Sequence, residues 1–189
     1  MAVETGIDRS LSPLWQEEVE PPQTVRELVC DRCEVELARR LNLLWHSRLP
    51  NTQRGPWQFS FAAHKQGIVY AVALWHNPSA RGLPGHWLEL RRLAVAPDAP
   101  HCTASWMLGR MRRWFQQNCP ERERMISYQD TAVHLGTIYA AAGWTRAYVS
   151  QPRIRDRSKA RVGTRRDYRS RQNGLSPDAS AKVRWEMAL

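Results

Sequence analysis

Four polar side chains have types and positions suited to moving a proton or a chemical group: His46, Ser127, Asp130 and Tyr139. Histidine titrates near neutral pH, so His46 could act as a base or hold a metal ion; the alternative is a helix-end histidine bonded to backbone. Asp130 follows an expected strand over Arg124–Gln129, and ligands of α/β sheets bind where strands end. It could orient an amine, accept its proton or bind metal, or simply cap the next helix.

Tyr139 lies nine positions beyond Asp130, inside an expected helix. A phenol with a pKa of about 10 can donate its proton to a strongly basic leaving group. The alternative is an aromatic ring packed in the core. Ser127 alternates with Gln129 on the preceding strand, which predicts a polar pair facing one side of the sheet.

The four cysteines do not form a recognisable metal motif. Cys30 and Cys33 make a CxxC pair, but a structural zinc site needs a second close pair. Cys102 and Cys119 are too far apart in the sequence to supply one simply. Because the CxxC pair falls inside an expected helix, we predict that these thiols pack rather than bind metal.

These residues must be positioned by an α/β fold. Thr24 and Glu27 form a capping box, followed by helical apolar spacing that predicts a helix ending before Pro50. Two strands and a turn at His64–Gln66 come next, and Asn77–Gly85 is expected to be loop. Those two strands are expected at Trp57–Ala63 and Gly67–Trp75. The remaining strands are expected at Trp87–Val95, Arg124–Gln129, Trp144–Val149 and Lys182–Leu189, and the later helices at Thr103–Gln117 and Thr131–Ala142.

Strands that alternate with helices predict a partly parallel, mixed sheet flanked by helices. We expect a loose arm over residues 1–23, one domain over 24–189, and a basic flexible insert over 153–178 before the last strand. The net charge is +10, and residues 151–189 carry 11 Lys or Arg against 4 Asp or Glu. This clustering favours a polyanionic partner over a merely solvated surface.

The central segment resembles the GNAT acyltransferase superfamily. Leu88–Pro97 is similar to the fourth strand of that fold, Ser105–Gln117 to its cofactor-binding helix, and Tyr139–Trp144 to its Y-x-x-x-G-aromatic element. The resemblance implies acetyl-CoA or a related acyl donor, and a tyrosine that protonates the departing thiolate. The residues it places against the cofactor are Ala94, Val95, Thr103, Ala104 and Ser105.

The loop before that helix departs from the GNAT pattern. The usual loop has the form Arg/Gln-x-x-Gly-x-Gly/Ala, whereas residues 99–105 read APHCTAS. A helix N-terminus binds anions through its free amides, and the family uses it for the pyrophosphate of coenzyme A. Without the glycines, Thr103 and Ser105 either bind phosphate or only cap the helix.

A closer resemblance covers roughly residues 41–149. Residues 45–50, 77–81, 89–93 and 127–139 are similar in order and spacing to the phage Mom-type DNA-modification proteins. That resemblance implies addition of a carbamoylmethyl-like group to the exocyclic amine of adenine in DNA, which protects phage DNA from restriction. It also suggests iron, for which His46 and Asp130 would be ligands.

The leading hypothesis is therefore a transferase of this Mom type that acts on a base turned out of double-stranded DNA. The alternatives are an acetyl-CoA-dependent N-acetyltransferase acting on a small amine, a protein amine or a modified base, and a catalytically idle DNA-binding protein. A homodimer stays open as a further partner. The expected phosphate contacts are Arg81, Arg92, Arg165, Arg166 and Arg169.

The N-terminus has acidic residues early, Glu4 and Asp8, and no apolar run. It therefore does not predict a secretory signal, and no stretch is apolar enough to span a membrane. We expect the cytoplasm of a bacterial host cell and no membrane partner.

Overall fold

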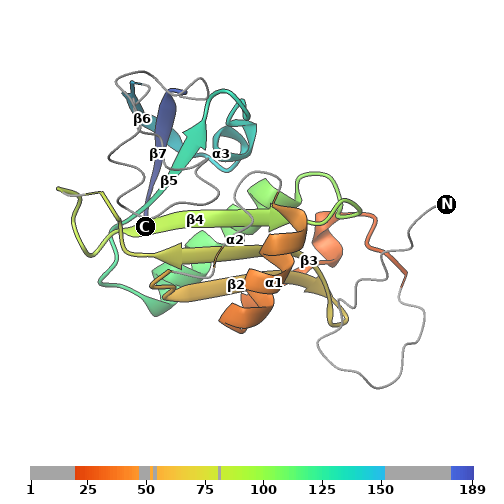
Figure 1. The fold of residues 1–189 in the computed structure, drawn as a ribbon. Helices are drawn as coiled ribbons and strands as arrows, with labels where there is room; N and C mark the ends of the chain where they lie inside the picture. Colours follow the sequence, from red (N-terminus) through yellow and green to blue (C-terminus); the bar gives the residue numbers. More distant parts are fainter. Residues whose placement is uncertain (1–19, 47–51, 53–54, 81, 152–179) are drawn as a thin grey trace, which may run out of the picture.

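A mixed seven-stranded sheet forms the centre of the molecule, with helices on both faces (Figure 1). The computed structural model describes residues 20–46, 52, 55–80, 82–151 and 180–189. The strands run in the order β1-β2-β3-β4-β5-β7-β6, which confirms the predicted α/β class. Their bounds are β1 Val29–Arg32, β2 Phe59–Lys65, β3 Ile68–His76, β4 Leu88–Val95, β5 Arg124–Asp130, β6 Thr145–Ser150 and β7 Lys182–Ala188, and the α-helices are α1 Val35–Trp45, α2 Thr103–Asn118 and α3 Thr137–Ala141.

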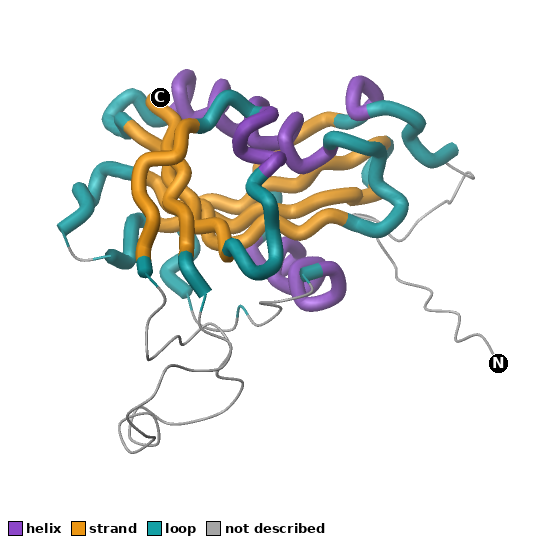
Figure 2. Tube along the Cα trace, turned by 90° about the horizontal axis from the view of Figure 1, so that it is seen from above, coloured by secondary structure: helices purple, strands orange, loops and turns teal. Residues whose placement is uncertain are grey.

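The two faces of the sheet have separate apolar cores. Helix α1 packs against β2, β3 and β4 on one face, whereas α2 and α3 lie together on the other (Figure 2). On the α2 face the rings of Phe61 and Trp75 meet Phe115 edge to face, at 5.5 and 5.1 Å between centroids. The indole of Trp75 also donates to the sulfur of Met111 at 3.1 Å. These contacts hold α2 firmly against the sheet.

Strands β4 and β5 run parallel but pair only briefly. Leu88, Glu89 and Leu90 pair with Met125, Ile126 and Ser127. Beyond Leu90, β4 continues beside β3 alone, while β5 continues beside β7. The two central strands therefore separate at their carboxyl ends (Figure 1), the place where α/β sheets bind ligands.

The last strand of the described chain lies inside the sheet rather than at its edge. Strand β7 pairs antiparallel with β5 along its whole length and with β6 on its other side. Its Val183 and Trp185 are buried. Although β7 was expected as a strand, this central position was not predicted.

The long N-terminal helix predicted from Thr24 is wrong in its first half. The capping box of Thr24 and Glu27 exists, but it starts only a short 3₁₀ helix, Val25–Glu27. The chain then extends as β1, which pairs with β2 and buries Cys30 between exposed neighbours. Strand pairing overrides the helical spacing here. Only α1 retains the helical conformation that we predicted.

The predicted packing role of the CxxC pair is supported. Burial raises the pKa of the Cys30 thiol to about 12 and that of Cys33 to about 11. Both groups are therefore protonated thiols at neutral pH; Cys30 belongs to the core on the α2 face, and Cys33 packs against the core on the α1 face.

The helix predicted over Thr131–Ala142 is also too long. Strand β5 ends at Asp130, and a turn over Thr131–Leu135 precedes α3. Gly136 has φ +78°, in the left-handed region, and stands as the N-cap of α3. Asp130 is therefore not the cap of this helix; its Oδ1 accepts the N–H of Ala132 at 3.1 Å instead. Gly143, with φ +77°, ends the helix as predicted.

The other elements match their predictions within a few residues, including α2, β4, β5 and the loop after β3. The turn between β2 and β3 is Gln66–Gly67 rather than His64–Gln66. The arm and the basic insert fall outside the described residues, apart from positions 20–23 of the arm.

Candidate active site

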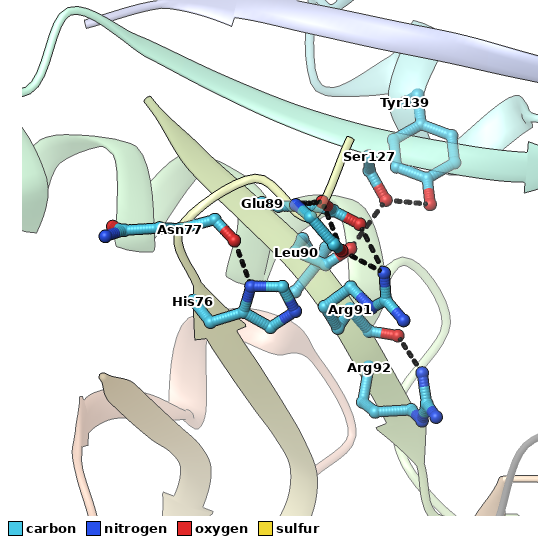
Figure 3. A network of polar contacts seen from close by, with 9 residues as sticks. His76, Asn77, Glu89, Leu90, Arg91, Arg92, Ser127 and Tyr139 are labelled. Atoms are coloured by element: carbon cyan, nitrogen blue, oxygen red, sulfur yellow. Dashed lines mark hydrogen bonds and ion pairs between the residues drawn. The ribbon is translucent and has the colours of Figure 1, made fainter. Parts of the chain in front are cut away.

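Three groups meet where β4 and β5 separate: the carbonyl of Leu90, the hydroxyl of Ser127 and the phenol of Tyr139. Ser127 donates to the Leu90 carbonyl at 3.2 Å, and its Oγ lies 2.9 Å from the Tyr139 hydroxyl. Since the one serine proton goes to Leu90, Tyr139 is the donor to Ser127. Figure 3 shows the phenol reaching toward β4 at this point.

The ring of Tyr139 is enclosed by aromatic residues. It stacks on Trp185 of β7 at 5.5 Å between centroids with 19° between the planes, and Trp144 lies at 5.5 Å. Burial raises the pKa of Tyr139 above its usual value, while Ser127 acts in the opposite direction. The phenol therefore holds its proton throughout the neutral range, as a general acid must.

Strand β4 carries a bulge at the same place. Leu74 pairs with Arg92 and Trp75 with Leu90, so Arg91 is an extra residue without a partner on β3. Because of this extra residue, the side chains that follow it on β4 point to the opposite faces of the sheet from those that regular alternation would give. As a result both Leu90 and Leu93 belong to the core on the α2 face, and Ala94 to the core on the α1 face.

The bulge also turns Arg91 toward a buried acid, Glu89. The Glu89 side chain is 2% exposed, and its carboxylate accepts from Arg91 at 2.9 Å and from the Ser79 amide at 2.9 Å. His76 pairs opposite Glu89 and bonds through Nδ1 to the Asn77 carbonyl (Figure 3). Of the two adjacent arginines on β4, Arg91 is the one that faces an acid.

His46 lies on the α1 face, as the residue that ends α1. Burial, together with the charges of Arg92 and His134, lowers its pKa to about 4. The burial of Arg92 itself, together with Arg91, lowers the pKa of Arg92 to about 10. Groups from the end of α1, from β4 and from the loop after β5 thus influence one another electrostatically, and His46 is neutral at pH 7.

The depressed pKa of His46 predicts a loss of stability in acid. The unfolded chain binds a proton near the model value of 6.5, whereas the folded chain binds it only near 4. The unfolded state therefore holds more protons between these values, and the free energy of unfolding falls as the pH drops through them. Denaturant titration at a series of pH values measures this fall.

Glutamine at position 46 provides the control, because it is neutral at every pH. We expect a smaller acid-dependent loss in His46→Gln than in the wild type, since all other titrating groups are shared. Equal pH profiles for the two proteins would contradict the assignment of the effect to His46.

Asp130 stands at the end of β5 and is 8% exposed. Its Oδ1 accepts from the Ser180 hydroxyl at 2.5 Å as well as from the Ala132 amide. Through these bonds Asp130 holds the start of the loop after β5 and the residue Ser180 that precedes β7. Whether it also acts on a substrate amine stays a prediction.

The described residues do not fit the iron ion that the resemblance suggests. Within residues 20–46, 52, 55–80, 82–151 and 180–189, no group of three or more His, Cys, Asp and Glu is gathered to hold a metal. His46 and Asp130 are the expected ligands, but they belong to no such group. The chemistry below is therefore derived from protein side chains alone.

The N-terminus of α2 begins at a left-handed residue, although the usual glycines are missing. Cys102, its N-cap, has φ +67°, a left-handed conformation that glycine usually supplies. Thr103 and Ser105 donate their hydroxyl protons to the carbonyls of Pro100 and Cys102, at 2.6 and 3.1 Å. The first-turn amides, including those of Ala104 and Ser105, are thus better placed to bind an anion than the hydroxyls are.

The other residues expected to contact the cofactor or DNA lie in different parts of the chain. Ala94 and Val95 lie on the part of β4 beyond its pairing with β5. Arg92 is half-buried beside His46. The remaining arginines of the predicted DNA contact lie outside the described residues, namely Arg81, Arg165, Arg166 and Arg169.

The sequence analysis did not select Glu89 or His134. An acidic residue in the apolar run of β4 was a visible signal for Glu89, because a buried carboxylate needs partners. His134 is exposed in the loop after β5. His134 acts on His46 only because of the way the β5–α3 loop folds. No local pattern in the sequence predicts that conformation.

The sequence of the chain matches a known protein family. The model of the Mom protein family matches residues 53–182, which include β4, β5, α3 and β6. The chain belongs to the Mom protein family. No curated protein matches its sequence.

The fold of this Mom family member is that of GNAT acetyltransferases. The ribosomal-protein-S18-alanine N-acetyltransferase from Escherichia coli aligns with a TM-score of 0.56 and 11% identity, over 85% of this chain and 93% of that one. An acetyltransferase from Bacillus subtilis, solved in complex with CoA, aligns with a TM-score of 0.58 and 10% identity, over 86% and 99%. At these identities the likeness concerns the fold alone. No described helix of the chain is long and apolar enough to cross a membrane.

Proposed function

We propose that the protein transfers an acyl group from a CoA thioester to the exocyclic amine of adenine in double-stranded DNA. The amine attacks the thioester carbonyl, the C–S bond breaks, and CoA leaves as its thiol, with an N-acyl adenine as the product. One observation carries the proposal. The proton donor Tyr139 belongs to the core on the α2 face, and its hydroxyl lies 2.9 Å from Ser127 at the end of the β4–β5 pairing. Arg92, on β4 beyond that pairing, acts electrostatically on His46 at the end of α1. A donor on the α2 face and an acceptor on the α1 face could therefore meet where β4 and β5 separate.

The acceptor would enter from the α1 face. His46 is neutral at pH 7, so its ring can accept a hydrogen bond from an amine and orient it. Arg92 retains its positive charge at this pH and suits a nearby phosphate. Membership of the Mom family supports DNA as the molecule that carries the amine.

The donor would lie on the α2 face. A CoA thioester supplies an activated group that an amine can attack. The amides at the start of α2 would bind its pyrophosphate, and the free edge of β4 beyond Leu90 would lie along its chain. Tyr139 would give its proton to the departing sulfur, and the proton released by the attacking amine would restore the phenol.

The decisive experiment is nucleoside mass spectrometry of DNA from cells that express the protein. We expect a modified deoxyadenosine that is absent from cells carrying the empty vector. A simple acetyl adduct and a carbamoylmethyl adduct differ in mass by one NH group, so the spectrum distinguishes the products. Unaltered DNA at good expression would contradict the proposal.

Calorimetric titration with acetyl-CoA tests the donor separately. Binding that is lost when bulky side chains replace Ala104 supports the α2 site. If the protein binds acetyl-CoA and acetylates a protein or a small amine while DNA stays unaltered, the function is that of an ordinary N-acetyltransferase.

A further inference from the structure

We propose that Leu135 enters the DNA double helix and fills the space left by the adenine that turns out into the active site. This inference rests on the proposed action on a base in duplex DNA, and it assigns a role to a residue outside the transfer machinery. The contacts that carry it lie in the β5–α3 loop, residues 131–136.

Leu135 is the most exposed large apolar side chain of the described chain, at 90%. Val133 in the same loop is 45% exposed. Single exposed leucines are common on protein surfaces, so exposure alone indicates no role. The position of this leucine is what distinguishes it: the loop joins Asp130 to α3, which carries Tyr139.

The loop that presents Leu135 is held rigidly from below. The Gln129 amide donates to the carbonyl of His134 at 2.5 Å, and its oxygen accepts from the indole of Trp185 at 2.7 Å. The amides of Val133 and His134 both donate to the carbonyl of Asp130, at 3.1 and 3.0 Å. His134 is thus held through both its amide and its carbonyl, while Gly136, on the other side of Leu135, accepts from the amides of Tyr139 and Ala140. Leu135 is therefore presented outward from a hydrogen-bonded support.

The same loop borders the acceptor side of the site. His134, the neighbour of Leu135, is close enough to His46 for its charge to lower the pKa of that ring. Arg92 acts on His46 in the same way. An apolar tip is therefore placed next to His134, in a loop that shares its electrostatic environment with His46 and Arg92, on a chain with a net charge of +10. This combination suits a phosphate backbone with stacked bases inside it better than an apolar protein surface.

The chemistry of the substrate requires such a residue. The exocyclic amine of adenine is paired within the duplex, so an enzyme that acts on it must turn the base out and meet the cost of unstacking. Proteins that open base steps insert apolar side chains such as Phe, Leu, Ile or Met. Leu135 has the right chemistry and is the residue that the loop exposes most.

The test measures base opening directly, with 2-aminopurine in place of one adenine in duplexes that cover all nearest-neighbour contexts. This analogue fluoresces strongly when it is unstacked. We expect the wild-type protein to raise the fluorescence in at least one context, and Leu135→Ala to lower the open fraction about tenfold. Leu135→Phe should retain opening, because phenylalanine is also an effective wedge. Binding to duplex DNA should change little, since phosphate contacts dominate it.

A second experiment uses duplexes with a mismatch opposite the target adenine. The mismatch removes much of the cost of opening the pair, so it should restore opening, and modification where transfer occurs, in Leu135→Ala. Val29→Ala is the matched control, since Val29 is 47% exposed on β1 at the far edge of the sheet. It should behave as the wild type does.

The outcomes separate this inference from the proposed function. If the wild type modifies adenine but Leu135→Ala opens and modifies paired duplexes equally well, the role of Leu135 is overturned and the transferase stands. If opening depends on Leu135 but DNA is never modified, the transferase proposal fails and the role of Leu135 in opening the duplex is retained. If the wild type opens the duplex in no sequence context, the role of Leu135 is overturned.

Discussion

Replacing Tyr139 with phenylalanine is expected to lower the rate of transfer by about a hundredfold or more. The substitution removes the proton that the leaving sulfur needs and keeps the ring that stacks on Trp185. The lost hydroxyl bond to Ser127 costs about 1 kcal/mol of stability, so the protein should still fold. Quantitative mass spectrometry of DNA modified by purified protein gives the rate, and circular dichroism checks the fold.

Tyr148→Phe is the matched control, because Tyr148 is a 55% exposed tyrosine on β6 outside the site. It should retain the wild-type rate. Since burial raises the pKa of Tyr139, the wild-type rate should also show no loss from ionisation of this phenol below pH 10 or so. A Tyr139→Phe protein that modifies DNA at the wild-type rate would remove the phenol from the mechanism.

Gly136→Ala is expected to have the second large effect, on both stability and transfer. A Cβ at this position would lie 2.5 Å from Oε1 of Gln129 and 2.7 Å from Cζ2 of Trp185, and φ is +78°. The left-handed backbone alone costs about 1–2 kcal/mol, and displacement of the two side chains adds to this. Because Trp185 supports Tyr139, transfer should fall along with the melting temperature.

Gly67→Ala isolates the backbone contribution. Gly67 also has a left-handed φ of +84°, but a Cβ there would meet nothing within 4 Å. We expect this variant to lose stability through strain alone and to retain activity. If the two variants lose equal stability and both modify DNA normally, the contact among Gly136, Gln129 and Trp185 does not support the site.

The elements that could be predicted from the sequence are those whose pattern is local. Helix α2 has its apolar stripe and β4 its bounding proline, so both were placed within a residue or two. Tyr139 and Ser127 were selected from different elements, and the structure brings them to 2.9 Å. That agreement reflects strand and helix spacing, which fix the direction of each side chain.

The errors occurred where a distant partner decides the conformation. Residues 29–32 have helical spacing, but β2 pairs with them and makes them a strand. The turn before α3 depends on Gln129 and Trp185, which are 56 positions apart. The bulge at Arg91 is likewise visible only in its register with β3. No local pattern carries this information.

The central position of β7 has a consequence for the timing of folding during synthesis. Strand β7 pairs with β5 and β6 on either side, and its Trp185 forms one wall around Tyr139. While the ribosome is still translating the earlier strands, β5 therefore has an exposed edge and Tyr139 lacks that wall. The half of the sheet that contains Tyr139 is therefore completed only after β7 has emerged from the exit tunnel, when this strand pairs with two neighbours that were made before it.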